Sequence, residues 1–124
     1  MPAKRILVVD DEPEVRQLME HFLTQRGYDV CIAENGKQAL TALDTFRADV
    51  VLLDMHMPEM DGLETLRRLA VRSPSLPVIM VTVNDDIETT ANLLQLGAAD
   101  YVPKPFNLDY LEQTINIQLS TARE

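Results

Sequence analysis

The chain has 124 residues, a formal net charge of −9 and a single cysteine. Its length suits one domain, and its hydrophobic fraction of 46% and charged fraction of 25% are those of an ordinary soluble globular protein. The negative charge argues against direct nucleic-acid binding by this domain. One cysteine excludes an intramolecular disulfide. Because the sequence contains neither a membrane-spanning run nor a secretory leader, we expect no membrane association and a cytoplasmic location.

Apolar runs alternate with helical patterns along the chain. Strands are expected at residues 5–9, 28–33, 50–53, 78–82 and 98–102. Helices are expected around apolar stripes at residues 15–23, 39–46, 63–70, 87–94 and 108–119. In the fourth helix the stripe includes Ile87, Ala91 and Leu94, with Leu93 as a further candidate. Five strands alternating with five helices predict right-handed crossovers and an α/β fold, with a parallel sheet covered by helices on both faces.

Side chains capable of chemistry follow these strands where each one ends. Asp10 and Asp11 follow the first strand, Asp54 the third, Thr82 closes the fourth, and Lys104 comes just after the fifth. In a parallel sheet all carboxyl ends share one edge, so we expect these side chains to gather there. If the strand order is 2-1-3-4-5, the first and third strands are neighbours and bring the three aspartates together.

Such a group of residues indicates a particular chemistry. Three nearby carboxylates repel one another, and hard oxygen ligands select magnesium or manganese as the cation that relieves the repulsion. A carboxylate beside such a cation can attack phosphorus, which makes Asp54 the candidate acceptor of an aspartyl phosphate. Lys104 and Thr82 supply the positive charge and the hydroxyl that the transferred group requires.

At these residues the sequence resembles the receiver (CheY-like) domain of two-component response regulators. The resemblance rests on residues 8–12 (Val-Val-Asp-Asp-Glu), 53–62 (with Met-Pro-Glu-Met-Asp-Gly), 81–82 and 97–106, and covers essentially the whole chain. It implies a flavodoxin-like (βα)5 doubly wound fold with a five-stranded parallel sheet in the order 2-1-3-4-5. It also implies a single receiver domain over residues 1–124, of which about 4–121 are structured.

The resemblance further implies roles for the acidic residues. Asp54 accepts a phosphoryl group from a histidine kinase or phosphotransfer protein. Asp11 and Asp54 bind Mg²⁺ directly, the main-chain oxygen of His56 is a third protein ligand, and Asp10 assists through water. By itself, the side chain of His56 is more simply explained as an exposed residue at the rim of the pocket.

A second set of roles follows from the same resemblance. Lys104 pairs with the phosphoryl group, Thr82 moves to hydrogen-bond it, and Tyr101 turns inward as Thr82 moves. By its pattern alone, Tyr101 is a half-buried aromatic side chain of the fifth strand. The peptide bond between Lys104 and Pro105 is expected to be cis.

The resemblance also suggests how the domain signals and how long the signal lasts. Partners, an effector of unknown type among them, are expected at the fourth and fifth helices. The fifth helix carries a second apolar set, Tyr110 and Ile117, which is explained equally well as a partner surface and as ordinary surface residues. The protein is expected to be a monomer or a phosphorylation-dependent dimer. Val83 stands where the family commonly has a small residue, and the rim positions fall at His56 and Asn84. Since neither is a strong general base for attacking water, we expect slow to intermediate self-dephosphorylation.

Two other functions remain open from the sequence. A magnesium-dependent phosphatase of the haloacid dehalogenase type also uses an aspartate nucleophile, but that family has Asp-x-Asp at the first strand, whereas this chain has adjacent Asp10 and Asp11. A phosphate-independent adaptor has no evident need for the full set of strand-end residues. We therefore expect a phosphoacceptor switch and not an enzyme.

Overall fold

The computed structural model describes residues 2–55, 57, 60–83 and 87–121, and of residues 87–90 and 121 it describes the backbone only. Five strands form one sheet: β1 (Arg5–Val9), β2 (Asp29–Ala33), β3 (Val50–Asp54), β4 (Val78–Thr82) and β5 (Asp100–Pro103). All neighbouring strands pair in parallel, in the order β2-β1-β3-β4-β5. The predicted fold class and strand order are therefore confirmed.

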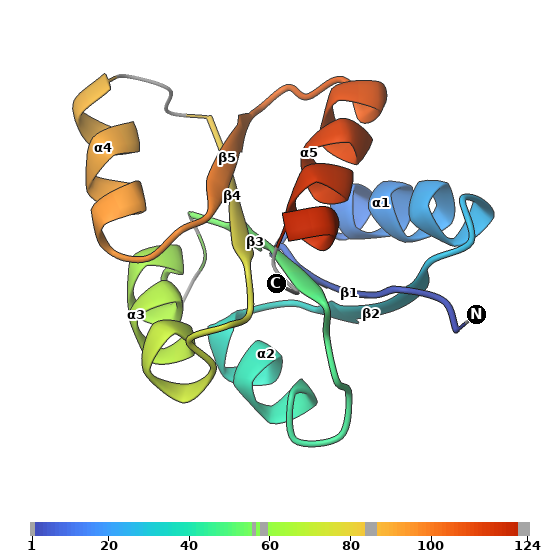
Figure 1. Cartoon of the computed structure of the whole chain (residues 1–124), viewed down its shortest axis with the longest axis horizontal. Helices are drawn as coiled ribbons and strands as arrows, with labels where there is room; N and C mark the ends of the chain where they lie inside the picture. The colour runs from blue at the N-terminus through green and yellow to red at the C-terminus, as the bar shows by residue number, and fades with distance from the viewer. Residues whose placement is uncertain (1, 56, 58–59, 84–86, 122–124) are drawn as a thin grey trace.

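Five helices connect the strands and cover both faces of this sheet (Figure 1). They are α1 (Pro13–Gln25), α2 (Gly36–Ala42), α3 (Gly62–Arg72), α4 (Ile87–Gln95) and α5 (Leu108–Thr121). Buried residues of α1 and α5 pack on one face of the sheet, and those of α2, α3 and α4 pack on the other. None of the described helices is long and apolar enough to cross a membrane.

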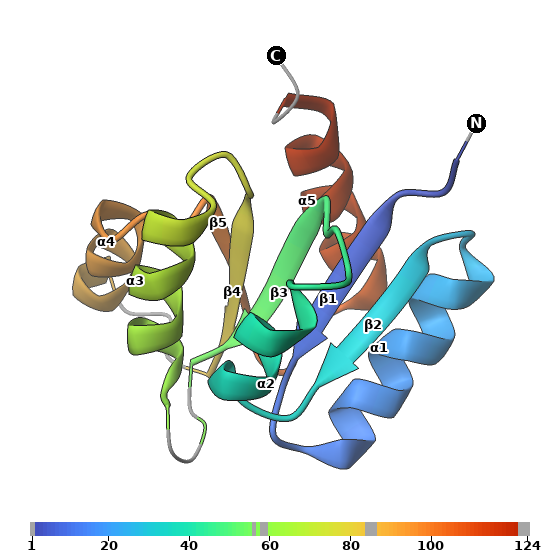
Figure 2. The ribbon, with the colours of Figure 1, turned by 90° about the horizontal axis from the view of Figure 1, so that it is seen from below.

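The central strand β3 explains why a carboxylate can be held at a defined place. All five of its residues are buried, because β1 and β4 flank it and helices cover both of its faces. A continuous apolar run is what such a doubly covered parallel strand requires. Asp54 is the last residue of this strand, at the edge where the carboxyl ends of the strands meet (Figure 2, lower edge).

Three expected boundaries differ from those observed. Helix α2 ends at Ala42, so Phe46 lies in the following loop, where its ring stacks under the guanidinium of Arg5 at 4.4 Å. Strand β2 begins at Asp29, one residue later than expected, and β5 begins at Asp100, two residues later. The ends of elements depend on backbone pairing with neighbouring strands and helices, which an apolar pattern does not specify.

The expected apolar stripe of α4 was partly wrong. Leu93 is 1% exposed, whereas Leu94 is 47% exposed and Ala91 is also exposed. Adjacent positions on a helix point about 100° apart, so a short helix lying on the sheet buries one of the two leucines and leaves the other in solvent. The side chain of Ile87 lies outside the described residues.

Candidate functional site

Lys104 is the centre of the candidate site. Its Nζ lies 2.8 Å from Oδ2 of Asp10, 3.4 Å from Oε1 of Glu12 and 3.5 Å from Oδ1 of Asp54. The lysine backbone is fixed by a hydrogen bond from its N–H to the carbonyl of Thr82 (2.7 Å), and the Lys104–Pro105 peptide bond is cis. One ammonium therefore links the carboxyl ends of β1 and β3 from the connection that follows β5.

The two aspartates that Lys104 joins are almost inaccessible to solvent. Asp10 is 1% exposed and Asp54 is 4% exposed. Asp10 is oriented on both sides, because its Oδ1 accepts from the N–H of Glu12 (2.9 Å) and its carbonyl accepts from Nη1 of Arg16 (2.7 Å). Buried carboxylates are tolerated when they are paired and hydrogen-bonded in this way.

The negative charges around Lys104 raise the pKa of its ammonium group. Burial by itself lowers the pKa of the ammonium, but its hydrogen bond to Asp10 and the negative charges of Asp10, Asp54 and Glu12 outweigh that effect, so the pKa is raised. Lys104 is thus a fixed positive charge at neutral pH, placed beside the Asp54 carboxylate. Such a charge can neutralise an anionic group carried by Asp54.

An acidic cluster lies at the end of β1 and is formed by Asp10, Asp11 and Glu12. One carboxylate oxygen from each of these residues lies within 4.8 Å of the other two. Asp10 is buried, while Asp11 and Glu12 are exposed, so a cation can approach from solvent. Carboxylate oxygens without histidine or cysteine suit a hard divalent ion such as Mg²⁺. The expected ligand His56 lies outside the described residues.

Thr82 is fully buried at the end of β4, and its Oγ1 donates a hydrogen bond to Sδ of Met55 (3.5 Å). Tyr101 is half-buried in β5 and packs against the core cluster on the side of α2, α3 and α4. The next residue after Thr82, Val83, is 65% exposed. Asn84, which with His56 was expected at the rim, lies outside the described residues.

The strand-end residues thus lie around one edge, but two of their neighbours did not emerge as site residues from the sequence. Glu12 contacts Lys104, and its only sequence signal is its place directly after Asp10 and Asp11. Met55 contacts Thr82 and also lines a cavity of about 530 Å³ together with Asp11, Met57, Asp61 and Leu63. A methionine after a buried strand carries no chemical signal of its own, because it is equally suited to filling a core.

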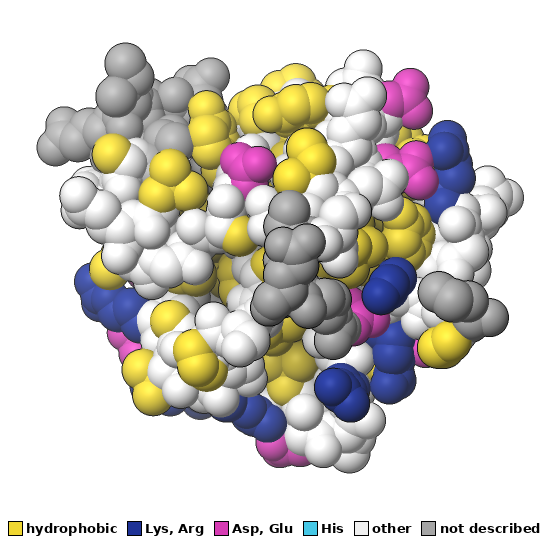
Figure 3. Space-filling view, viewed as in Figure 1, with side chains coloured by type: hydrophobic (Ala, Val, Ile, Leu, Met, Phe, Trp, Pro, Cys, Tyr) yellow, Lys and Arg dark blue, Asp and Glu magenta, His cyan; other side chains and the backbone are white. Residues whose placement is uncertain are grey.

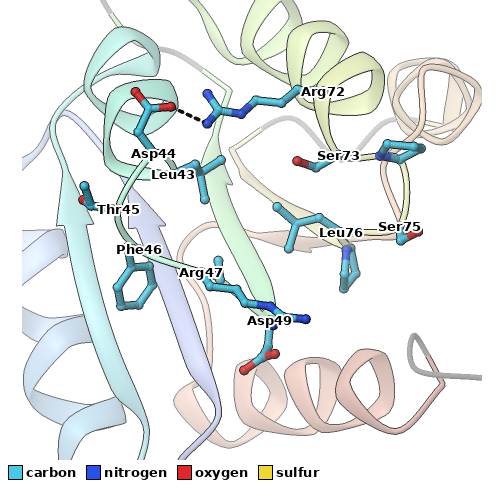
Figure 4. Close-up of a pocket in the computed structure, with 13 residues that line it drawn as sticks. Leu43, Asp44, Thr45, Phe46, Arg47, Asp49, Arg72, Ser73, Ser75 and Leu76 are labelled. Carbon is cyan, nitrogen blue, oxygen red and sulfur yellow. Dashed lines mark hydrogen bonds and ion pairs between the residues drawn. The ribbon is translucent and has the colours of Figure 1, made fainter.

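A second cavity, of about 440 Å³, opens at the opposite edge of the sheet (Figure 4). It lies between the loops that precede β3 and β4, and Arg72 and Asp44 form an ion pair across its rim. Leu43 and Leu76 extend into it in Figure 4. None of the strand-end residues lines this cavity, so it is separate from the candidate site.

Fold and site together define a doubly wound α/β domain with a lysine-bridged acidic centre at its switch point. A family model described as the response regulator receiver domain matches residues 6–116, and the chain belongs to this family. Receiver domains generally act as phosphoacceptor switches and bind Mg²⁺.

Curated relatives are regulators of two-component systems. The chain is 38% identical over 122 residues to the regulatory protein AtoC of Escherichia coli, covering 97% of this chain and 26% of that protein. It is 42% identical over 111 residues to the response regulator MprA of Mycolicibacterium vanbaalenii, covering 90% of this chain and 48% of that protein. The chain thus spans about a quarter to a half of the length of these relatives.

Solved structures of receiver domains have the same fold over nearly all of the chain. The receiver domain of the Francisella response regulator 1452 superposes with a TM-score of 0.89 at 32% identity, covering 94% of this chain and 97% of that one. A CheY-like receiver domain protein from Methanospirillum hungatei gives a TM-score of 0.91 at 30% identity, covering 98% and 97%.

Proposed function

We propose that this domain is a phosphorylation switch in which Asp54 accepts a phosphoryl group from a histidine kinase or a phosphotransfer protein. The observation that carries the proposal is the position of Lys104, whose Nζ lies between the buried carboxylates of Asp10 and Asp54. The ammonium stabilises the negative charge of the Asp54 carboxylate, which is the nucleophile in this proposal, and then compensates the phosphoryl oxygens.

Mg²⁺ completes the site in this proposal. Asp11 and Asp54 hold it with the main-chain oxygen of His56, and Asp10 assists through water; Mn²⁺ has the same ligand preference. The ion supplies positive charge that neutralises the oxygens of the phosphoryl group during transfer. The mutual proximity of the Asp10, Asp11 and Glu12 oxygens supports this part of the proposal, because their repulsion falls when a cation binds.

In the transfer step, a carboxylate oxygen of Asp54 forms a bond to phosphorus as the nitrogen–phosphorus bond of the donor phosphohistidine breaks. Lys104 then pairs with the phosphoryl group, and the Thr82 hydroxyl donates a hydrogen bond to it. Tyr101 turns inward as Thr82 moves. Tyr101 is half-buried in β5 and pairs with Met80 of β4. Because Met80 lies only two residues before Thr82 in the same strand, this position suits a coupled change of Thr82 and Tyr101.

The signal is proposed to leave the domain through α4, β5 and α5. Leu94 on α4 and Tyr110 and Ile117 on α5 are large hydrophobic residues exposed by 47%, 47% and 57%. Figure 3 shows hydrophobic side chains at the surface over the connection between β5 and α5. This surface suits an effector of unknown type or a second copy of the chain in a phosphorylation-dependent dimer. The protein is proposed to be cytoplasmic.

The proposal is tested by incubating the protein with Mg²⁺ and acetyl phosphate and mapping the adduct by mass spectrometry. A base-labile phosphoryl group on Asp54 is expected, and Asp54→Asn must abolish it. Asp61→Asn is the matched control, because Asp61 is a nearby carboxylate whose helix-capping bond to the N–H of Glu64 an asparagine can also make. An adduct that survives Asp54→Asn would overturn the proposal.

The same experiment separates the two rival functions. Sustained turnover of phosphate esters would favour the phosphatase, and no adduct at all would favour the phosphate-independent adaptor. Once formed, the phosphoryl group should be lost slowly or at an intermediate rate, and a lifetime of seconds in Mg²⁺ would contradict that expectation.

A further inference from the structure

Met55 has a defined place beside the site that the proposed function does not use. Asp54 pairs with Val81 in the register between β3 and β4, so the next residues along the two strands, Met55 and Thr82, lie across from each other. The sulfur of Met55 accepts a hydrogen bond from Oγ1 of Thr82 at 3.5 Å. The thioether therefore sits next to the hydroxyl that the proposed switch has to redirect.

The backbone of Met55 is held by the start of α3. Its carbonyl accepts a hydrogen bond from the N–H of Gly62 (2.9 Å), and a Cβ on Gly62 would lie 2.5 Å from the Met55 Cα. This close approach leaves the residue little freedom to move away from Thr82. The side chain is only partly buried, and besides contacting Thr82 it lines the cavity that Asp11 also lines.

The chemistry of the two acceptors decides what this contact can do. A threonine hydroxyl has one proton to donate, so it cannot donate fully both to the Met55 sulfur and to a phosphoryl oxygen. A thioether is a weak acceptor, whereas an anionic phosphoryl oxygen is a strong one. The sulfur can thus hold the hydroxyl in the absence of phosphate and release it when phosphate arrives.

We propose that Met55 is a positioning residue that retains the Thr82 hydroxyl in the unphosphorylated state and so sets how readily the switch responds to the phosphoryl group. The inference rests on the proposed function of Asp54 and Thr82. Its direction follows from linkage: a contact made in only one of two states favours that state, and removing the contact favours the other.

The test uses beryllofluoride with Mg²⁺ as a phosphoryl analogue, and its affinity is measured by fluorine NMR. Met55→Leu keeps the volume and removes the acceptor, and it should tighten beryllofluoride binding about two- to fivefold. Met57→Leu is the matched control, because Met57 lines the same cavity but is buried elsewhere in the core cluster. The affinity of this control should stay equal to that of the wild type.

A second arm distinguishes the hydroxyl contact from packing. In a Thr82→Val background the hydroxyl is absent, so Met55→Leu should no longer change the affinity. Tightening that persists there, or an unchanged affinity of Met55→Leu while the wild type binds normally, would overturn this inference alone. Failure of the wild-type protein to bind beryllofluoride would instead overturn the proposed function and this inference with it.

Discussion

The Nζ atom of Lys104 lies 2.8 Å from Oδ2 of Asp10, although the two residues are 94 positions apart in the chain. The side chain of Lys104 is 11% exposed and that of Asp10 is 2% exposed, so water screens this pair only weakly. The same ammonium reaches Asp54 at 3.5 Å, and it thereby balances two buried carboxylates at once.

Replacing Lys104 by methionine should destabilise the domain as well as impair the switch. Lys104→Met leaves Asp10 and Asp54 buried without their cation, and breaking a buried pair in this way costs about 3–5 kcal/mol of unfolding free energy. Chemical denaturation at neutral pH measures the loss. Added Mg²⁺ should restore part of it, since it supplies positive charge to the same carboxylates. Lys4→Met, at an exposed lysine, should change stability little, and an equal loss there would contradict the assignment.

The raised pKa of Lys104 predicts how stability changes with pH. Because the folded-state pKa lies above the unfolded value of 10.5, the contribution of Lys104 is fully present below pH 10.5 and is lost as the pH rises through the folded-state pKa. The pKa of Tyr28 is raised by its burial and by the charge of Glu112, so the contribution of Tyr28 to the free energy of unfolding is also lost at alkaline pH. Followed upward from neutral pH, the difference in unfolding free energy between the wild type and Lys104→Met reports on the lysine: it should stay constant up to pH 10.5 and shrink above that pH.

Asp11 is expected to contribute to the affinity for Mg²⁺ and not to the stability of the metal-free domain. It is exposed at the rim of the acidic cluster, so Asp11→Asn should weaken Mg²⁺ binding by at least about tenfold and leave the metal-free stability equal or slightly higher. Isothermal titration gives the affinity, and the rise of Tm with Mg²⁺ gives an independent readout. Asp44→Asn removes a carboxylate at the opposite edge of the sheet and with it the exposed ion pair to Arg72, so it should leave the Mg²⁺ affinity and the Mg²⁺-dependent rise of Tm unchanged. Equal Mg²⁺ affinity in the two variants would place the metal elsewhere.

A side chain at Gly62 is expected to destabilise the domain. A Cβ at this position would lie 2.5 Å from the carbonyl oxygen of Asp54 and 2.5 Å from the Met55 Cα, so Gly62→Ala must displace α3 or the end of β3. The expected cost is about 1–3 kcal/mol, with slower phosphorylation of Asp54 by acetyl phosphate. Gly27→Ala is the comparison: its φ of +92° makes a side chain costly, but its Cβ would meet nothing within 4 Å. That variant should lose stability while phosphorylation of Asp54 keeps its rate.

The sequence by itself determined the fold class and which strand ends carry chemistry. The apolar runs before Asp10, Asp54 and Thr82 have the pattern of strands buried on both faces, and parallel strands place their carboxyl ends at one edge. The period of the apolar pattern and the alternation of strands with helices are sufficient to specify both features. The order of the strands came from the family resemblance, since alternation alone is compatible with other orders.

The tertiary structure decided which of these groups touch one another. The contact of Lys104 with Glu12, the hydrogen bond from Thr82 to Met55 and the burial of Leu93 instead of Leu94 depend on register, helix rotation and side-chain rotamers. Such features are set by packing between elements far apart in the chain, which leaves no periodic signal in the sequence. For this reason the pattern of residues located the edge of the sheet, and only the packed fold revealed that one lysine holds its carboxylates together and one methionine holds its hydroxyl.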